Sequence, residues 1–353
     1  LQNFYILIFR SNEMNGKNWM KTWILFFIIV GTIAVAFTYL IDPYGENYHF
    51  NKRGINKIKI RQDERQLKFD YLNVNSNYTS IILGNSKGTY LDPDIIKHYT
   101  GLEAYNASFS GGTMDEFLEY TKWLINNRNI KQLFIAFEYF ALSEFVSNGV
   151  MPPELRKNNP YKFNYISPSR IVDSMKTVLH NILNNKEVGN EEKFYLDKGM
   201  RYDPSYFEIK KSIKNQSKHI EDFKTKDIVW HGKQISEIQI NNLKEIVALC
   251  KENNVKLFLL QTPNSYLKLN YNDKENYKRL LSLIKIIAKE IHPVYFFNDF
   301  NYVNYNLNYF KDHSHFNYDV GKLIFKKVFL DEGIGVEVTP NNIYKIDRLI
   351  KLK

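Results

Sequence analysis

Hydrophobic and polar positions divide the chain into one long apolar segment and a later series of short apolar runs and amphipathic stretches. The apolar segment, residues 23–41, carries no charge, and as a helix it would be about 28 Å long, close to the thickness of a bilayer's hydrocarbon core. Trp19, Trp23 and Tyr39 lie near its two ends, where aromatic rings favour membrane interfaces. The pattern predicts one transmembrane helix, preceded by a short cytoplasmic segment at residues 1–22.

Two other kinds of segment share this hydrophobic pattern. A buried core helix usually carries some polar face, which residues 23–41 lack. A cleaved signal peptide has a shorter apolar region, and no small-x-small cleavage site follows this one. Basic residues are more numerous after the segment than before it, but charge bias acts mainly through short loops, and a long domain follows here. We therefore expect a single-pass protein of the cell membrane with its large domain extracytoplasmic.

The remainder of the chain alternates between strand-like and helix-like patterns. Residues 42–78 are polar and charged with no sustained period, which predicts a stalk. Residues 79–83 form a short apolar run, followed at once by a Gly-Asn-Ser turn. Further strands are predicted at residues 102–106, 132–137, 255–261 and 294–297, and helices at residues 92–98, 113–127, 235–253, 275–290 and 317–330. Strands that alternate with helices indicate an α/β fold with a parallel sheet covered on both faces.

This alternation is interrupted between residues 144 and 233. Proline recurs there among polar and aromatic stretches, at Pro152, Pro153, Pro160, Pro168 and Pro204. The composition predicts an irregular insertion within a domain at residues 79–353. Ligands of parallel α/β sheets bind at the carboxyl ends of the strands, so we expect the insertion to pack over that edge and to shape an acceptor groove.

Composition narrows the classes of function. The chain has 353 residues, of which 44% are hydrophobic, and this excludes a disordered protein. A single cysteine, Cys250, excludes an intramolecular disulfide framework and any multi-cysteine metal site. The net charge is +10, from 48 basic and 38 acidic residues, and reflects either a compositional bias or attraction to an anionic envelope polymer or membrane surface. The basic residues are scattered without a recognition motif, so no nucleic acid is expected as partner.

Short polar motifs fall where the predicted fold would place a ligand. They are GNS at residues 84–86, NASFSGGT at residues 106–113 and DHSH at residues 312–315. A serine hydroxyl is a weak nucleophile until a neutral imidazole takes its proton, and a carboxylate holds that imidazole in the required tautomer. No complementary cluster of metal ligands accompanies DHSH. Taken alone, the Gly-Asn-Ser turn is explained as well by a serine that caps the following segment, so the case for serine chemistry depends on the three motifs together.

The order of these motifs resembles the SGNH, or GDSL-like, hydrolase superfamily. This resemblance implies a flavodoxin-like three-layer α/β sandwich that needs no metal or organic cofactor. It implies that Ser86 is the nucleophile, with Asp312 and His315 as the D-x-x-H pair that completes the catalytic triad. The backbone N–H groups of Ser86 and Gly111 match donors of the oxyanion hole.

The chain departs from the superfamily at its third motif. Gly-x-Asn-Asp is expected within residues 135–140 but the sequence there is IAFEYF. The asparagine donor to the oxyanion hole is thus missing, and loss of one such donor costs on the order of a hundredfold in rate. Either a residue of the insertion substitutes for it, or the activity is modest. At the place of the motif stands Glu138, which we expect to accept hydrogen bonds from loop backbone.

This departure, together with the anchor, resembles a subset of the superfamily: cell-envelope proteins of teichoic-acid D-alanylation and of alginate or peptidoglycan O-acetylation. The resemblance implies an O-acyltransferase or esterase that acts on acyl groups of a cell-envelope glycan through an acyl-serine, with a membrane-bound O-acyltransferase as partner. The alternative is a non-catalytic assembly factor that binds an acyl carrier or glycan. The missing asparagine favours the assembly factor, whereas the presence of Ser86, Asp312 and His315 favours the enzyme.

Overall fold

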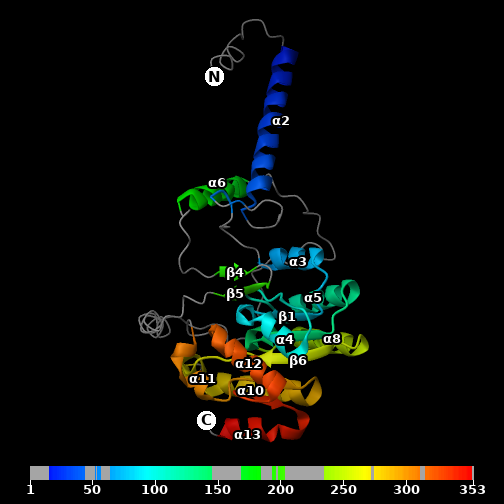
Figure 1. The fold of residues 1–353 in the computed structure, drawn as a ribbon, viewed down its shortest axis with the longest axis vertical. Coiled ribbons are helices and arrows are strands. Elements are labelled where there is room, and N and C mark those ends of the chain that lie inside the picture. The colour runs from blue at the N-terminus through cyan, green and yellow to red at the C-terminus, as the bar shows by residue number, and fades with distance from the viewer. Residues whose placement is uncertain are drawn as a thin grey trace. The chain divides into compact units, whose positions relative to one another are not determined.

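The fold is described from a computed structural model of the chain (Figure 1). The structure describes residues 16–43, 52, 54–56, 64–144, 168–183, 193–195, 198–202, 234–271, 274–310 and 315–351. Two compact units divide the chain. The smaller unit takes residues 1–63 and 160–188, and the larger takes residues 64–159 and 189–353.

The larger unit is an α/β domain whose described strands form a six-stranded sheet. Across the sheet the order is β2 (Ala104–Asn106), β1 (Ser80–Gly84), β3 (Gln132–Phe137), β6 (Lys256–Gln261), β7 (Val294–Phe296) and β8 (Val336–Val338). Neighbours pair in parallel except β7 and β8, which are antiparallel. The parallel part has the 2-1-3-4-5 order of flavodoxin-like sheets. The predicted α/β fold with a parallel sheet is confirmed, and β8 is an edge strand that the pattern did not indicate.

Hydrophobic side chains cover both faces of this sheet. Successive residues of a strand point to opposite faces, so Leu83 and Ile135 belong to one buried cluster, while Ile82 and Phe134 belong to another. Across the second face, Phe134 of β3 stacks on Phe258 of β6 with ring centroids 4.5 Å apart. Strands that are apolar on both sides are typical of a sheet between two helical layers.

Helices form the two outer layers (Figure 1). One hydrophobic cluster takes side chains from α3 (Glu64–Val74), α5 (Met114–Asn127), α8 (Glu237–Glu252), α10 (Lys274–Glu290) and α13 (Tyr344–Lys351). The other takes side chains from α4 (Pro93–Thr100), α11 (Tyr302–Tyr305) and α12 (Tyr318–Leu330). A short helix, α9 (Tyr266–Tyr271), follows β6. The domain is therefore a three-layer sandwich.

The ends of α4 show how local sequence sets these helices. Asp92 caps the first turn by accepting a hydrogen bond from the N–H of Asp94, and Pro93 occupies the first turn, where its missing N–H costs nothing. Gly101 ends the helix with a left-handed φ of 71°, the conformation that favours glycine at a helix C-terminus. Both ends of the helix are thus readable from the sequence.

α3 lies within residues 42–78, where we expected a stalk without sustained period. Its Phe69 and Leu72 are buried in the hydrophobic cluster of the larger unit. The Phe69 ring lies 4.7 Å from that of Trp123 on α5. These 11 residues are therefore part of the α/β unit.

The insertion at residues 144–233 leaves and rejoins the domain at one place. An antiparallel bridge pairs Ser143 with Ile235, and the N–H of Glu144 donates to the carbonyl of Gln234. Because its ends meet, the insertion leaves the order of the sheet intact. Its described elements are α6 (Pro168–Leu183), β4 (Lys193–Tyr195) and β5 (Met200–Tyr202).

β4 and β5 form a hairpin at the carboxyl end of β2, which confirms the expected placement for this part of the insertion. The N–H of Asn106, the last residue of β2, donates to the carbonyl of Lys198 at 2.9 Å. Gly199 has a φ of 66° and packs so tightly that a Cβ would lie 2.0 Å from the Asn106 carbonyl oxygen. α6 belongs to the smaller unit, and residues 145–167, 184–192, 196–197 and 203–233 lie outside the described residues.

The smaller unit contains the predicted apolar helix as α2 (Gly16–Ile41). Among the described residues this is the one helix long and apolar enough to cross a membrane. Only 11% of its most apolar 18-residue stretch is buried. Asn56 caps its C-terminal end, because its Nδ2 donates to the carbonyls of Leu40 and Ile41 at 3.1 and 3.0 Å. A buried core helix is therefore excluded, and α2 is either an anchor or a signal sequence.

Gly84, the last residue of β1, provides a test of the packing beneath the carboxyl edge of the sheet. A Cβ there would lie 2.7 Å from the carbonyl oxygen of Ala136 on β3. We expect Gly84→Ala to lower the free energy of unfolding by about 1–3 kcal/mol, the usual cost of overpacking, in denaturant titrations followed by circular dichroism. The control is Gly31→Ala, whose Cβ would meet nothing within 4 Å. A Gly84→Ala protein as stable as this control would contradict the close approach of β1 and β3.

Candidate functional site

The chain turns sharply after β1 and presents Ser86 at the carboxyl edge of the sheet. The N–H of Asn85 donates to the carbonyl of Ala136 at 3.2 Å, and its Oδ1 accepts from the N–H of Lys87 at 3.0 Å. Asn85 and Lys87 are fully buried, whereas Ser86 between them is partly exposed. The turn thus presents a solvent-accessible hydroxyl between two buried residues. It lies at the topological switch point, where the strand order reverses and where ligands of such sheets bind.

His315 reaches this hydroxyl from the far end of the sequence. Its Nε2 lies 2.8 Å from the Oγ of Ser86, a hydrogen-bonding distance. The histidine comes just before α12, whose N-cap Asn317 accepts a hydrogen bond from the N–H of Val320. The Tyr90 ring lies 6.1 Å from the imidazole. Two of the residues that the sequence motifs single out are therefore in contact.

The third member of the expected triad, Asp312, lies outside the described residues, as does its neighbour His313. The role of Asp312 in orienting His315 stays a prediction.

Gly111 lies in the loop that joins β2 to α5. Its φ of 67° is in the left-handed region that favours glycine, and a Cβ would meet nothing within 4 Å. The loop lies beside the end of β1, since the N–H of Phe109 donates to the carbonyl of Gly84 at 3.0 Å. Glycine is therefore required here by backbone conformation, and the proposed use of its N–H in an oxyanion hole stays a prediction.

Asn106, the first residue of NASFSGGT, joins β2 to the segment after Ser86. Its Nδ2 donates to the carbonyls of Gly88 and Leu91, each at 2.7 Å, and its Oδ1 accepts from the N–H of Ser108 at 3.0 Å. The side chain is fully buried. These contacts give Asn106 a structural role in shaping the turn.

Charged residues of α3 hold the loop that carries Gly111. The carboxylate of Glu64 accepts from the N–H and the hydroxyl of Ser110 at 2.9 and 3.1 Å. The buried ammonium of Lys68 donates to the carbonyl of Ser108. Neither residue stands out in the sequence, because a charged side chain in a polar segment normally faces solvent.

Arg65 of α3 continues this set of contacts. Its guanidinium forms a bidentate ion pair with Glu116 of α5 at 2.7 and 3.1 Å and lies 4.3 Å from the centre of the Phe109 ring. Glu116 also accepts from the N–H and hydroxyl of Thr113, the N-cap of α5. The end of the loop and the start of α5 are therefore fixed by one buried carboxylate.

Glu138 occupies the position of the missing third motif, directly after β3. We expected loop backbone to donate to its carboxylate, and the structure shows two lysine side chains in contact with it. Lys87 Nζ lies 2.5 Å from Oε1, and Lys268 Nζ lies 3.1 and 3.4 Å from Oε1 and Oε2. All three side chains are nearly or fully buried. The residue that stands where the resemblance would place an asparagine motif is thus part of a buried ion pair.

Lys87 links this pair to the next strand. Its ammonium also donates to the carbonyl of Pro263 at 2.9 Å and to the Oδ1 of Asn264 at 2.6 Å. An ammonium has three protons to donate, so these contacts with Glu138, Pro263 and Asn264 satisfy it. Since Lys87 follows β1, Glu138 follows β3 and Asn264 follows β6, one cation joins the carboxyl ends of three neighbouring strands.

Asparagine side chains extend the network to β7. The Oδ1 of Asn298 accepts from the N–H of Asn264 at 2.6 Å, and its Nδ2 donates to Gln261 Oε1 at 2.6 Å. Asn304 of α11 donates to the carbonyl of Asn264 at 2.8 Å. Burial raises the pKa of the adjacent Asp299, against the effect of a hydrogen bond from Asn301. The framework behind Ser86 is therefore polar and hydrogen-bonded.

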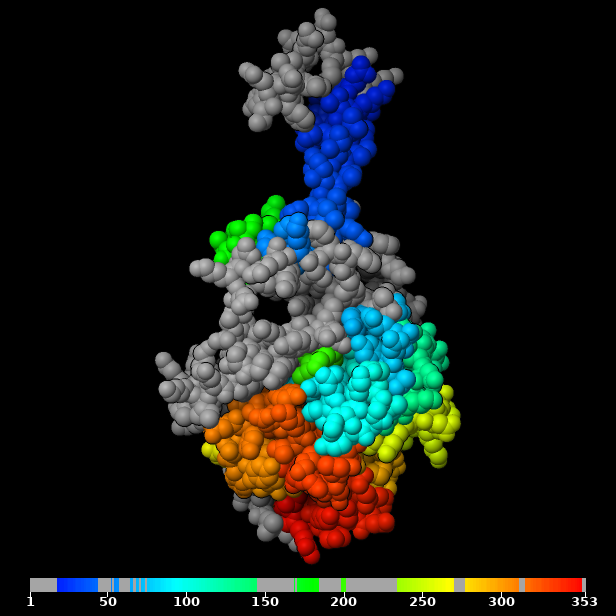
Figure 2. All heavy atoms as spheres, viewed as in Figure 1, coloured from blue at the N-terminus to red at the C-terminus, as the bar shows by residue number. Residues whose placement is uncertain are grey.

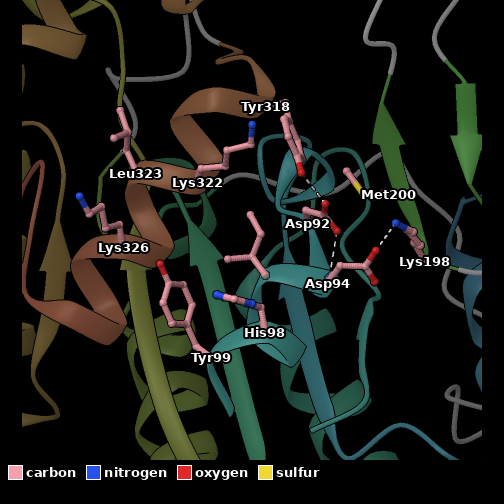
Figure 3. A pocket seen from close by; sticks show the side chains of 11 residues that line it. Asp92, Asp94, His98, Tyr99, Lys198, Met200, Tyr318, Lys322, Leu323 and Lys326 are labelled. Carbon is pink, nitrogen blue, oxygen red and sulfur yellow. Dashed lines mark hydrogen bonds and ion pairs between the residues drawn. The ribbon is translucent and has the colours of Figure 1, made fainter. Parts of the chain in front are cut away.

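A pocket of about 610 Å³ opens beside the site, between α4, α12 and β5 (Figure 3). Across it the Tyr318 hydroxyl donates to Asp92 Oδ2 at 2.7 Å, and Lys198 pairs with Asp94. Ser86 is not among the described residues that line it. Its described lining comes from the two helices and the segment around β5, so the pocket is not built around Ser86.

Comparisons with known proteins add no family: no family model matches the chain, and no curated protein matches it. What the structure establishes is an α/β domain with a mostly parallel sheet.

The buried pair predicts unequal costs for two substitutions. Glu138→Gln removes the carboxylate charge that faces two buried ammonium groups, so we expect it to lower the free energy of unfolding by about 3–5 kcal/mol. Lys268→Met keeps the closer Lys87–Glu138 contact of 2.5 Å and should cost only about 1–2 kcal/mol. Denaturant titration of the full chain in detergent measures both. Equal losses would show that Lys87 is not the principal partner of Glu138.

Proposed function

We propose that this protein is a membrane-anchored SGNH-type O-acyltransferase or esterase that acts on acyl groups of a cell-envelope glycan. The observation that carries the proposal is the 2.8 Å contact between Ser86 Oγ and His315 Nε2 at the switch point of a flavodoxin-like sheet. A nucleophile and a base within hydrogen-bond reach of each other are the diagnostic feature of activated-serine chemistry. The resemblance of the motifs to the superfamily supports the same assignment.

The chemistry proceeds in two steps. Ser86 Oγ attacks the acyl carbonyl as His315 Nε2 takes its proton, and His315 then gives that proton to the departing alcohol, which leaves an acyl-Ser86 ester. In the second step a sugar hydroxyl or water attacks this ester, with His315 again taking and returning one proton. Asp312 is assigned to the other ring nitrogen, where a carboxylate would keep the imidazole in the required tautomer.

Stabilisation of the oxyanion is assigned to the backbone N–H groups of Ser86 and Gly111. Glu138 stands where the superfamily has its asparagine, and a carboxylate held by Lys87 and Lys268 donates no hydrogen bond. Loss of one oxyanion donor lowers the rate by on the order of a hundredfold. A slow site of this kind is better suited to an acyl donor that is delivered at high local concentration than to an acyl donor that must be captured from dilute solution.

Transfer to a sugar hydroxyl is the proposed physiological reaction. Water at about 55 M competes for the acyl-enzyme, so transfer requires an acceptor bound in register, where effective molarities exceed that value by orders of magnitude. An anchor at α2 would keep the domain at the membrane surface, where a membrane-bound O-acyltransferase is the proposed source of acyl groups.

A second candidate function is a non-catalytic assembly factor that binds an acyl carrier or the glycan. The replacement of the oxyanion asparagine by the buried pair of Glu138 and Lys87 favours it. Its distinguishing property is binding that survives the loss of Ser86.

Covalent labelling separates these candidates. The full chain in detergent is treated with an activated acyl ester, with and without purified envelope glycan, and acyl groups are followed by mass spectrometry. We expect acyl-Ser86 and labelled glycan from the unsubstituted chain. Ser86→Ala has no hydroxyl to acylate and should give no adduct at residue 86, and labelled glycan should fall by on the order of 10⁴-fold in both Ser86→Ala and His315→Gln. The matched control is Ser282→Ala, which removes an exposed hydroxyl from α10 and should change neither.

Each alternative result points to a different function. Free acid released at an undiminished rate, with no Ser86-dependent label on glycan, would indicate an esterase. Failure to detect acyl-Ser86 with any donor, while glycan or carrier is still bound, would leave the assembly factor.

The proposed topology places the N-terminus in the cytoplasm and the large domain outside. Protease added to intact spheroplasts should digest the domain that follows α2, because the proposed orientation puts that domain on the outer side of the bilayer. Detergent lysis serves as the control for protease access. Full protection in intact spheroplasts would overturn both the topology and the envelope-glycan substrate.

A further inference from the structure

α6 has its polar and apolar faces placed opposite to those of an ordinary surface helix. Its buried side chains are polar or charged: Arg170, Asp173, Ser174, Thr177 and Asn181. Its large apolar side chains are exposed, by 47 to 72%: Val172, Met175, Leu179, Ile182 and Leu183. A helix at the surface of a water-soluble domain normally buries the apolar side instead.

The exposed apolar residues form one continuous stripe. Val172, Met175, Leu179 and Ile182 follow the three- and four-residue spacing that places side chains on the same face of a helix. The buried polar residues share the opposite face, and inside it the Asn181 Nδ2 donates to the Thr177 carbonyl at 2.7 Å. A stripe of this size left open on a folded unit marks a surface for association.

The place of α6 in the smaller unit indicates what covers the stripe. α6 lies across the C-terminal end of α2, where Thr38 and Ile41 are buried although most of α2 is exposed (Figure 1). In the space-filling view the green atoms of α6 lie at the surface beside the blue atoms of α2 (Figure 2). The apolar stripe is therefore at the level where a helix spanning a bilayer leaves the hydrocarbon, next to the apolar surface of that helix.

We propose that α6 is an interfacial helix that lies in the same bilayer as α2, with its apolar stripe inserted among the lipid acyl chains. This proposal rests on the proposed anchoring by α2. Amphipathic helices of this kind bury their apolar face about 5–10 Å into the boundary between headgroups and acyl chains. Lys176, which is exposed at the edge of the stripe, is long enough to reach lipid phosphate while its methylenes remain on the apolar side.

The membrane accounts for the stripe better than a protein partner does. The hydrocarbon surface of α2 and the stripe of α6 belong to one compact unit, so the lipid that surrounds one helix is in reach of the other. Burying the polar face of α6 against its own unit is then favourable, because the remaining face meets lipid and not water. The insertion would thereby make a second contact with the membrane, beside that of α2.

The test uses the full chain reconstituted in vesicles of phosphatidylcholine and phosphatidylglycerol. An environment-sensitive fluorophore is attached at Leu179→Cys and, as matched control, at Ile238→Cys, an apolar position exposed by 70% on α8 of the larger unit. The native Cys250 is 1% exposed, and burial raises the pKa of its thiol to about 12, so it stays unreactive at neutral pH. Met175→Cys is a second probe of the stripe if the first variant does not fold.

We expect the label on α6 to emit at shorter wavelength than the control label in the same vesicles, and brominated lipids to quench it about twofold more than the control label. A label on α6 that stays in water, or that is shielded from water but not quenched by lipid, would overturn the proposal, and the second result would assign the stripe to a protein. Retention of the chain in alkaline-washed vesicles tests α2 separately. Loss of the chain from those vesicles would overturn both proposals.

Discussion

The ion pair between Lys87 and Glu138 is the interaction on which the arrangement of the site depends. The ammonium is fully buried one residue after Ser86, and its partners follow two further strands of the sheet. A buried charge is tolerated only while all its partners stay in place, since each lost contact leaves an uncompensated group in a medium of low polarity. The loops after β1, β3 and β6 must therefore keep their relative positions together. The turn that presents Ser86 is held rigid in the same way, because Lys87 is its next residue.

A second group of charges fixes the other side of the site. Glu64, Arg65 and Lys68 hold the loop of Gly111 through backbone and carboxylate contacts, all away from bulk water. Oxyanion donors are effective only when they are oriented before the reaction begins, because the protein then has nothing to reorganise as charge develops. α3 lies in the chain between α2 and β1, so the segment that connects the apolar helix to the sheet also supports the proposed site.

The proposed reaction and the proposed membrane contacts complement each other. A site with a weakened oxyanion hole gains little from dilute substrates but much from a donor and an acceptor held nearby. Attachment through α2 and α6 would restrict the domain to the membrane surface, where both substrates are confined. The physical advantage is one of local concentration and orientation.

The sequence by itself determined the α/β class and the apolar helix, because strand and helix periods are local properties. The pairing of Ser86 with His315, which are 229 residues apart, was expected only through the resemblance of three short motifs to a superfamily. The sequence did not indicate β8, whose three residues carry no readable period, or α3, whose buried face is partly charged. The partners of Glu138 were also hidden, since Lys87 and Lys268 lie 51 and 130 residues away. A charged residue normally faces water, and whether it is buried depends on partners that only the folded chain brings together. The tertiary structure therefore decided which charges support the site, and which face of α6 remained uncovered.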